Sequence, residues 1–279
     1  MMDTIYFLAV IFILLSSCVG HGIFISKIFK FNYHSSIGFN GLLGLIFLTL
    51  ISYLSVLILE DKTFFNVLVF LIGFIIFLTK IKKIKISTLE IIIILSLITS
   101  IFISKTHDDF PFYHLQQSLN FSLNKFYIGL PNLNFFYSYH SSILFLNSIF
   151  YLPYFKFYLF YIPILFFLIF SVLLLYENII NFKNLPFLRF YALFCLLFIL
   201  TKFTRLSEHG TDISGQIIIL ISLLYFFKFF YDKKNNTDYL LFFFLLTTLS
   251  LTIKTYFVFY SILILVVLLS KNISFSVNL

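Results

Sequence analysis

The sequence has no tryptophan and few charged residues. Only 11% of its 279 residues are Asp, Glu, Lys or Arg, whereas soluble domains carry roughly 25%. Hydrophobic residues make up 61% of the chain. A soluble fold does not have enough interior to hide this much apolar surface from water, so the composition excludes a soluble globular protein. We predict an all-α polytopic transmembrane helical bundle that lies in a lipid bilayer.

Cysteines, glycine motifs and internal repeats are also scarce. The two cysteines, Cys18 and Cys195, lie in apolar runs without the spacing of a metal site or a disulfide, so we expect buried free thiols. The nine glycines form neither a GxxxxGKS/T nor a GxGxxG motif. This argues against ATP-driven transport by this chain alone. No internal repeat is evident in the sequence.

The net charge of +8 comes from lysines and arginines that are spread over short loops. A nucleic-acid-binding protein would gather them on one face, so we expect no nucleic acid partner and interpret the excess as cytoplasmic anchoring. The N-terminus has no positively charged segment before Thr4, although Leu15 to Cys18 loosely resembles a lipoprotein cleavage box. We therefore expect a retained first span rather than a signal peptide.

Apolar runs predict about nine spans. They cover residues 4–19, 37–59, 64–79, 86–103, 157–176, 188–204, 213–230, 239–253 and 256–269. Together they form a single membrane domain in three parts. A four-span region covers residues 1–104, a polar extracytoplasmic loop covers residues 105–140, and a multi-span region covers residues 141–279.

One apolar segment, residues 141–152, is short and ends at Pro153. If it does not cross the bilayer, eleven Lys and Arg residues fall in inner loops and six in outer loops; if it crosses, the split is nine to eight. Because Lys and Arg prefer the cytoplasmic side, the charge bias favours the non-crossing arrangement. That arrangement puts Glu208, His209 and Asp212 on the same outer side as the polar loop.

The polar loop, residues 105–140, is the one long interruption of the apolar pattern. It contains Asp108, Asp109 and three histidines, His107, His114 and His140. Such a segment between spans is costly unless it faces water or carries out chemistry. Adjacent carboxylates bind a divalent cation such as Mg or Mn, or supply a general base, but the same pair also suits a solvated helix cap.

Three short runs follow the acidic pair in and just after this loop. They are Phe-Tyr-His-Leu-Gln at residues 112–116, Gly-Leu-Pro-Asn-Leu at residues 129–133 and His-Ser-Ser at residues 140–142. This arrangement resembles a family of bacterial multi-pass membrane proteins of uncertain function that is similar to the type-C glycosyltransferase superfold. The resemblance implies that fold with a large first outer loop, and a location in the inner (cytoplasmic) membrane. It also implies a polyprenyl-phosphate-linked sugar donor, with transfer of a hexosyl or pentosyl group on the extracytoplasmic side.

The resemblance also implies roles for individual residues. Asp108 and Asp109 match the acidic motif of the family. By this resemblance Asp108, Asp109 and His114 would be catalytic, and the two aspartates could also bind a metal. The substrate-binding candidates are His107, Tyr113, Gln116, Asn132, His140, Arg205, Glu208, His209, Asp212 and Lys254. Asp212 matches an Asp that ends a polar stretch in the family, whereas Glu208 and His209 have no clear counterpart.

Lys254 interrupts an apolar run near the end of the chain. Two interpretations fit this position. Lys254 is either a point charge that neutralises a donor phosphate or a loop lysine in a tight hairpin between two short spans. Two other functions stay open, a transporter or flippase of a lipid-linked or polar solute and a polysaccharide polymerase. Because the chain ends at Leu279 soon after a span, an inactive truncated member of the family is a further alternative.

Several other residues suggest ordinary structural roles. Gly38, Gly41 and Gly44 predict a small-residue face for helix packing, and Asn147 predicts a hydrogen bond within the bundle. Glu90 suits the first turn of a helix. His21 is expected in a solvated inner loop, because the first predicted span ends before it.

Overall fold

The computed structural model describes residues 2–31, 36–84, 86–102, 108–132, 135–182, 185–206, 211–231 and 237–269. Within these ranges the chain forms helices joined by turns, with one isolated bridge between Leu152 and Lys156 and no strand. The prediction of an all-α protein is therefore confirmed.

Among the described residues, six helices are long and five are short. The long ones are α1 (Met2–Ile28), α2 (Ile37–Ile58), α3 (Thr63–Lys80), α7 (Ile162–Asn181), α8 (Pro186–Leu206) and α9 (Thr211–Tyr231). The short ones are α4 (Thr88–Ile98), α5 (Leu115–Leu123), α6 (Ser142–Ile149), α10 (Thr237–Ile253) and α11 (Ile262–Leu269). The remaining 3-10 or π-helical segments are η1 (Ile81–Lys83), η2 (Thr99–Phe102), η3 (Phe110–His114), η4 (Leu130–Asn132), η5 (Phe135–Ser138), η6 (Phe157–Leu159) and η7 (Thr255–Ser261).

Five segments of the described chain are long and apolar enough to cross a membrane. They are Thr4–Ile28, Ile37–Ile58, Thr63–Lys80, Phe157–Asn181 and Thr211–Tyr231. These segments support the predicted bilayer environment and the multi-pass character of the chain. The other four predicted spans coincide with α4 and η2, with α8, with α10, and with η7 and α11. Three of those four regions are apolar helices of only 10–17 residues, so the count of nine spans stays a prediction.

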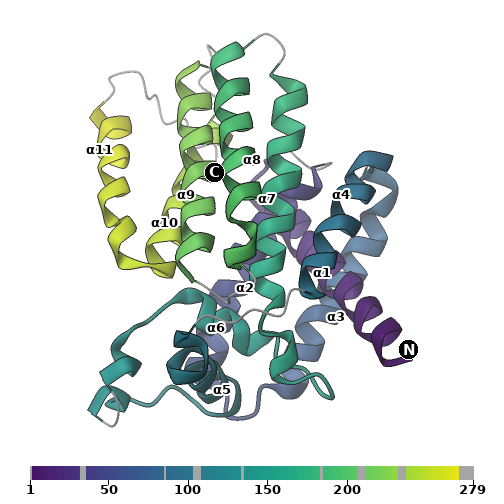
Figure 1. Ribbon diagram of the computed structural model, residues 1–279, viewed down its shortest axis with the longest axis vertical. Helices are drawn as coiled ribbons and strands as arrows, with labels where there is room; N and C mark the ends of the chain where they lie inside the picture. The colour runs from purple at the N-terminus through teal and green to yellow at the C-terminus, as the bar shows by residue number, and fades with distance from the viewer. Residues whose placement is uncertain are drawn as a thin grey trace.

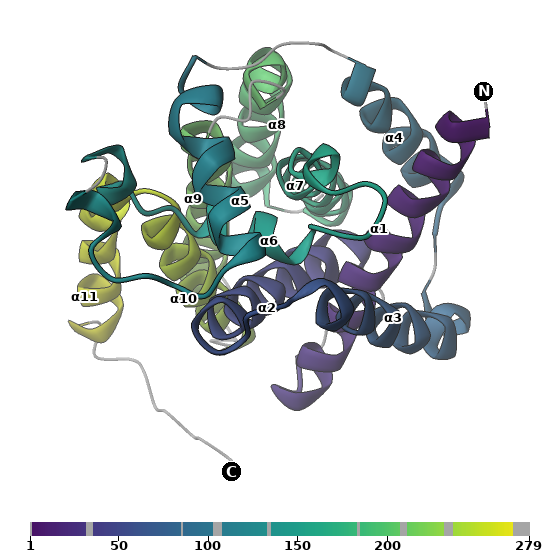
Figure 2. The ribbon, with the colours of Figure 1, turned by 90° about the horizontal axis from the view of Figure 1, so that it is seen from below.

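The long helices form a bundle around α7, with two short helices at one end. In Figure 1, α7, α8, α9 and α10 stand upright in the middle, α11 lies on the left, and α1, α3 and α4 lie on the right. Helix α7 contacts α2, α4, α8 and α9, and Figure 2 shows it between its neighbours. Helices α5 and α6 lie at the bottom of Figure 1. We call this end of the molecule, which also carries η3 and η6, the loop end.

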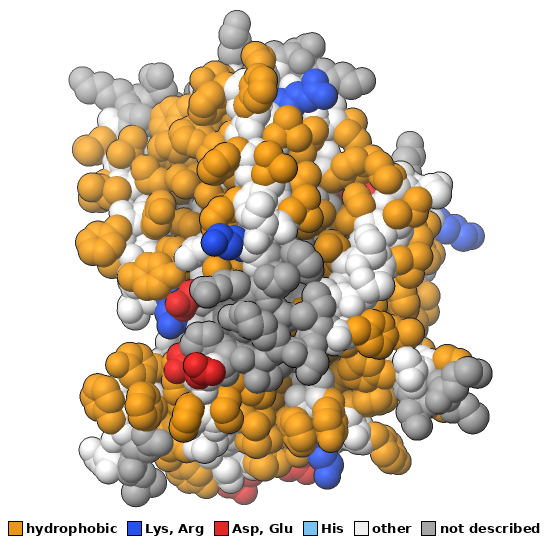
Figure 3. Space-filling view, in the orientation of Figure 1, with side chains coloured by type: hydrophobic (Ala, Val, Ile, Leu, Met, Phe, Trp, Pro, Cys, Tyr) orange, Lys and Arg blue, Asp and Glu red, His pale blue; other side chains and the backbone are white. Residues whose placement is uncertain are grey.

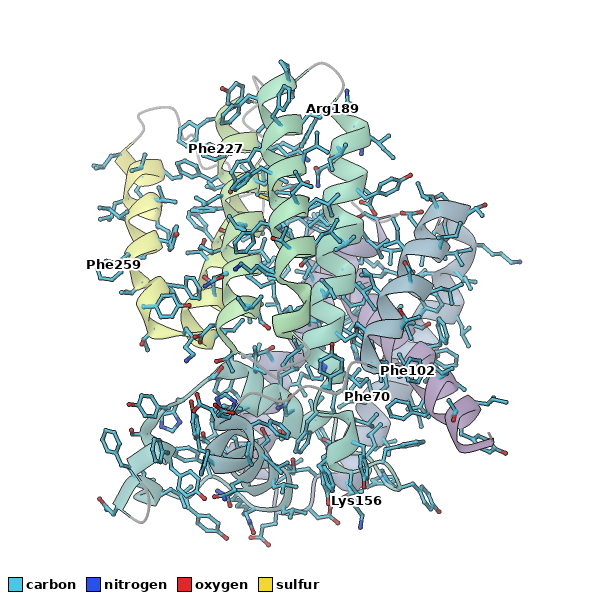
Figure 4. The ribbon with its side chains drawn as sticks, in the orientation of Figure 1. Phe70, Phe102, Lys156, Arg189, Phe227 and Phe259 are labelled. Atoms are coloured by element: carbon cyan, nitrogen blue, oxygen red, sulfur yellow. The ribbon has the colours of Figure 1, made fainter. Side chains whose placement is uncertain are left out.

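Helix α6 decides the assignment of the ambiguous segment at residues 141–152. It has eight residues, all of them buried, and packs against α2 and α5. At a rise of about 1.5 Å per residue it is about 12 Å long, whereas a bilayer core is about 30 Å thick. The segment therefore does not cross the bundle. Accordingly, Lys156 after α6 lies at the loop end, while Arg189 in α8 lies at the opposite end (Figure 4).

Glycines allow α2 to approach two neighbouring helices closely. A Cβ atom on Gly44 would lie 1.8 Å from the carbonyl oxygen of Cys18 in α1. A Cβ atom on Gly38 would lie 2.4 Å from the backbone nitrogen of Leu174 in α7, and one on Gly41 would meet a phenylalanine ring of the same helix. The predicted small-residue face is confirmed, and it serves both α1 and α7.

His21 lies inside a helix, so the expectation of a solvated loop position is wrong. Helix α1 continues to Ile28, past the predicted end of the span at Val19. The His21 side chain is buried, and its Nε2 atom is 2.9 Å from the carbonyl oxygen of Val69 in α3. A hydropathy pattern ends a span at its first polar residues, whereas the helix continues because α3 supplies a hydrogen-bond partner.

Three smaller predictions are confirmed. Cys18 and Cys195 are buried free thiols. Glu90 closes a capping box with Ser87 at the start of α4. The Asn147 amide hydrogen-bonds to Ser118 Oγ over 3.0 Å, which joins α6 to α5.

Candidate functional site

A cavity of about 130 Å³ lies where the loop end meets the upright helices, and segments far apart in the sequence line it. Its lining residues are Tyr113, His114, Ser138, Tyr139, His140, Ser141, Leu144, Thr211, Lys254 and Thr255. We call it the junction cavity. Figure 3 shows acidic and basic side chains close together at this boundary, on a face that is otherwise mostly hydrophobic. The junction cavity therefore brings the polar loop together with the starts of α9 and η7.

Tyr113 and His114 are held by η3, a π-helical turn that leads directly into α5. Asp109 is the N-cap residue of η3, and a proline occupies its first turn, where a missing backbone N–H costs nothing. The Tyr113 hydroxyl donates to Asp109 Oδ2 over 3.2 Å, and its ring stacks on Phe136 with 5.6 Å between centroids. Tyr113 is thus buried and oriented toward the acidic pair.

Two carboxylates that are distant in the sequence influence the Tyr113 hydroxyl, and one of them, Asp109, accepts its hydrogen bond. Burial, together with the charge and hydrogen bond of Asp109 and the charge of Asp212, raises the pKa of Tyr113 to about 12. Asp109 and Asp212 therefore both act on one phenol. Because its pKa is far above neutral, this hydroxyl remains a hydrogen-bond donor to Asp109 under physiological conditions.

Lys254 is the cationic group of the junction cavity. It is the one extended residue between α10 and η7. Its Nζ atom lies 2.8 Å from Asp212 Oδ1, and the two side chains are 31% and 56% exposed. Asp212 lies in the first turn of α9, where the helix dipole favours a carboxylate. Lys254 thus lies in a tight junction between two helical segments and also lines the cavity. Its role toward a donor phosphate stays a prediction.

The ion pair between Lys254 and Asp212 is not tightly sequestered. Partly exposed pairs of this kind contribute about 0–1 kcal/mol to stability, because water screens the charges. An anion that enters the junction cavity could therefore replace Asp212 as the partner of Lys254 at small cost.

Three other candidates lie in different surroundings. Asp108 is exposed in a turn just before η3. Gln116 is exposed on α5, and its Oε1 atom accepts a hydrogen bond from the Tyr137 hydroxyl over 2.9 Å. Asn132 is exposed in η4. Gln116 and Asn132 do not line the junction cavity, whereas the exposed His140 does.

Four candidates fall partly or wholly outside the described residues. They are His107, Glu208 and His209, and the side chain of Arg205, whose backbone lies near the end of α8. Their assigned roles stay predictions.

The metal interpretation of the acidic pair finds no ligand set in the described part of the chain. No three His, Cys, Asp or Glu side chains there come together as a metal site. Asp109 is also already engaged by the Tyr113 hydroxyl. A divalent cation at Asp108 and Asp109 stays a prediction, and the chemistry proposed below uses side chains only.

Sequence reasoning missed several lining residues of the junction cavity. Tyr139 and Ser141 flank His140, and Thr211 precedes Asp212, so each is next to a residue that was identified. Such neighbours carry no chemical signal of their own. Proximity along the chain to a candidate residue was the only available indication.

Comparison with models of protein families, with curated proteins and with solved structures found no match to this chain. The type-C fold and the activity that the sequence resemblance implies therefore stay predictions. What can be argued about function comes from the geometry of the loop end.

Proposed function

We propose that this protein is a membrane transferase of the glycosyltransferase kind. It would use a polyprenyl-phosphate-linked sugar as donor and act at the loop end, on the extracytoplasmic side of the bacterial inner membrane. One observation carries the proposal: Lys254, which pairs with Asp212, lines the junction cavity together with Tyr113 and His114. A cation, two histidines and the nearby carboxylate of Asp109 suit phosphate binding and proton removal in one place.

Lys254 would hold the donor phosphate. A phosphate that enters the junction cavity exchanges with Asp212 as the partner of the ammonium group, and His114 and His140 line the same cavity. The cavity volume of about 130 Å³ is below the roughly 300–1,000 Å³ of ordinary ligand pockets. It therefore suits a phosphate group, while the polyprenyl chain stays in the lipid.

Asp109 would act as the general base. Its carboxylate takes the proton from an acceptor hydroxyl, and the resulting oxygen attacks the anomeric carbon of the donor sugar. The bond from that carbon to the phosphate oxygen breaks, and polyprenyl phosphate leaves with the bonding electron pair. The hydrogen bond from Tyr113 orients the Asp109 carboxylate toward the acceptor.

The test is donor consumption by the full chain in lipid nanodiscs. Radiolabelled polyprenyl-phosphate hexoses and pentoses are supplied with membrane extracts as acceptor, and release of polyprenyl phosphate is measured. We expect Asp109→Asn to lower turnover by about 100-fold or more, in the range of a lost general base. Lys156→Met is the matched control, because Lys156 is exposed at the loop end and does not line the junction cavity. Equal turnover in wild type and in both Asp108→Asn and Asp109→Asn contradicts the assignment.

A carrier of a polar or lipid-linked solute is a second candidate, and one observation favours it. Lys228 is buried inside α9 at the opposite end of the bundle, and it interacts electrostatically with Glu177 of α7. Charges inside spans are typical of transport pathways. Movement of labelled donor lipid across proteoliposomes without cleavage of the sugar–phosphate bond would favour the carrier over the transferase.

A further inference from the structure

A second cavity lies at the loop end and takes no part in the proposed chemistry. It has a volume of about 510 Å³, within the roughly 300–1,000 Å³ typical of ligand sites. Its lining residues are Glu60, Asp61, Thr63, Ser122, Leu123, Asn124, Lys125 and Tyr127. We call it the α5 cavity, because Ser122 and Leu123 belong to the last turn of α5.

We propose that the α5 cavity binds a neutral saccharide, as the part of a glycan acceptor that lies beyond the reacting hydroxyl. The role of this saccharide as an acceptor rests on the proposed transferase function, whereas saccharide binding itself does not. Its basis is the combination of cavity size, paired charges and mixed hydrogen-bonding groups.

The charged groups of the α5 cavity already have partners, an ion pair at Glu60 and a backbone hydrogen bond at Asp61, which favours a neutral ligand. Glu60 Oε1 lies 3.1 Å from Lys125 Nζ. Asp61 Oδ1 accepts a hydrogen bond from the Thr63 backbone N–H over 2.9 Å, and this bond lowers the pKa of Asp61. A phosphate would be repelled by the two carboxylates. A divalent cation would have to displace Lys125 and would meet the nearby ammonium group of Lys62.

The lining offers both donors and acceptors, as vicinal sugar hydroxyls require. Carboxylates accept, the Lys125 ammonium group donates, and hydroxyl and amide groups do both. Tyr127 adds a half-exposed ring on which the apolar face of a sugar can pack. Pockets that combine an apolar surface with a few convergent polar groups are the usual form of small-molecule sites.

The floor of the α5 cavity is preorganised by a buried lysine. Lys62 is only 1% exposed, and its Nζ atom donates to the carbonyl oxygen of Asn124 over 2.6 Å, which ties the α2–α3 loop to the end of α5. The Phe126 backbone N–H also donates to the carbonyl oxygen of Val56 over 2.9 Å. Beneath these contacts, Phe121 packs with Val56 in a separate apolar cluster. A ligand therefore meets a formed site and orders little of the chain on binding.

Helix α5 connects the two cavities. Its N-terminal end follows His114 of the junction cavity, and its C-terminal turn lines the α5 cavity. Nine helical residues span about 13 Å. This separation is too large for one sugar ring to touch both cavities, so the proposal requires an acceptor of more than one saccharide unit.

Direct glycan binding tests the inference. The full chain in detergent, carrying a fluorescent N-terminal tag, is applied to an array of neutral oligosaccharides built from glucose, galactose, mannose and N-acetylglucosamine. We expect binding to a subset of chains longer than one unit. Tyr127→Ala and Asn124→Ala should each weaken that binding by about tenfold or more. Asn124→Ala keeps the backbone carbonyl that holds Lys62, so the floor of the cavity stays intact.

Tyr158→Ala is the matched control, because Tyr158 is an exposed aromatic residue at the loop end that lines neither cavity. All variants are compared by thermal unfolding, so that a loss of binding in an unfolded variant is recognised. Absence of glycan binding in the wild type overturns the inference, as does equal binding in Tyr127→Ala and wild type. Calcium or magnesium binding that Glu60→Gln abolishes, without any glycan binding, identifies a cation site instead and also overturns it.

The outcome separates this inference from the proposed function. Donor turnover without glycan binding contradicts only the saccharide site. Glycan binding without donor turnover supports the saccharide site and contradicts the transferase.

Discussion

Two lysines, one at each end of the bundle, have opposite surroundings. Lys254 at the loop end is 31% exposed and pairs with Asp212 beside the junction cavity. Lys228 at the opposite end is only 8% exposed. Its Nζ atom lies 4.4–5.1 Å from the ring centroids of Phe182, Tyr225 and Tyr239 and 3.3 Å from Asn178 Oδ1.

The surroundings of Lys228 and Lys254 indicate which of the two ammonium groups a ligand can reach. Lys228 is enclosed by partners from α7, α9 and α10, so its charge stabilises the contact among these helices. Lys254 has a single exposed carboxylate as its described ion-pair partner and faces a cavity. Two residues of the same type in apolar runs therefore have different surroundings, aromatic rings around Lys228 in α9 and a cavity beside Lys254 at the start of η7.

The largest effect on the folded protein should come from a substitution that disrupts the bundle and therefore the surroundings of both lysines. In Gly44→Leu the new side chain begins 1.8 Å from the Cys18 carbonyl oxygen, so α1 and α2 must separate. We expect loss of the monodisperse, folded protein in size-exclusion chromatography. Leu57→Ala, on an exposed position of the same helix, is the control and should behave like wild type. A folded Gly44→Leu protein would show that the close contact is not needed for assembly of the bundle.

The second prediction separates the two lysines by activity. Lys254→Met should lower donor turnover by about 100-fold, since removal of a preorganised charge from a reacting group costs about 2.7 kcal/mol or more. Lys228→Met should keep turnover per folded molecule within about threefold, because Lys228 lies at the other end of the bundle; threefold corresponds to about 0.65 kcal/mol. The measurement is polyprenyl phosphate release in nanodiscs. A strong loss of turnover in Lys228→Met would remove the distinction between the two ends.

The third prediction compares the same two variants by stability. Lys228→Met loses three cation–π contacts, each about 0.5–2 kcal/mol, and leaves Asn178 Oδ1 without its ammonium donor. We expect its apparent Tm to fall by several degrees. Lys254→Met loses only a partly exposed ion pair, so its Tm should stay close to that of wild type. The reverse order in a thermal unfolding assay would mean that Lys254 has the structural role.

The smallest effect concerns the way in which protein stability depends on pH through Tyr113 at the loop end. Burial and nearby carboxylates raise the pKa of Tyr113 to about 12, above the usual 10 of the unfolded chain. The protonated form is therefore favoured in the folded state. Its contribution to stability is fully present below pH 10 and is lost as the pH rises toward 12. Tyr113→Phe should show a shallower fall of Tm between pH 9.5 and pH 11 than wild type. Parallel curves for the two proteins would contradict this assignment.

The fold class and much of the packing followed from residue patterns. Apolar runs marked the helices, the Gly38–Gly44 stretch marked a packing face, and Glu90 marked a helix start. The acidic pair Asp108 and Asp109 was found because charge is rare in this chain. The limits of α1 and the surroundings of His21 were not predictable, because they depend on a carbonyl group that α3 presents from elsewhere in the chain.

The candidate site was predicted as a set of residues but not as an arrangement. Charge bias favoured one side for Asp109 and Asp212, yet no pattern indicated that Tyr113 would lie close to both. Gln116 and Asn132 belong to the same motifs as the cavity residues but lie outside the lining. The α5 cavity had no signal in the sequence, since its walls come from two separate loops.

The sequence by itself determined that this chain is helical and suited to lipid, because hydropathy and helix periodicity are properties of consecutive residues. It also determined where the polar loop lies. Only the tertiary structure decided that Lys254 pairs with Asp212, that Lys228 is enclosed by aromatic rings, and that α6 stays at the loop end. These contacts depend on which helices become neighbours, and that choice is made by packing across the whole bundle.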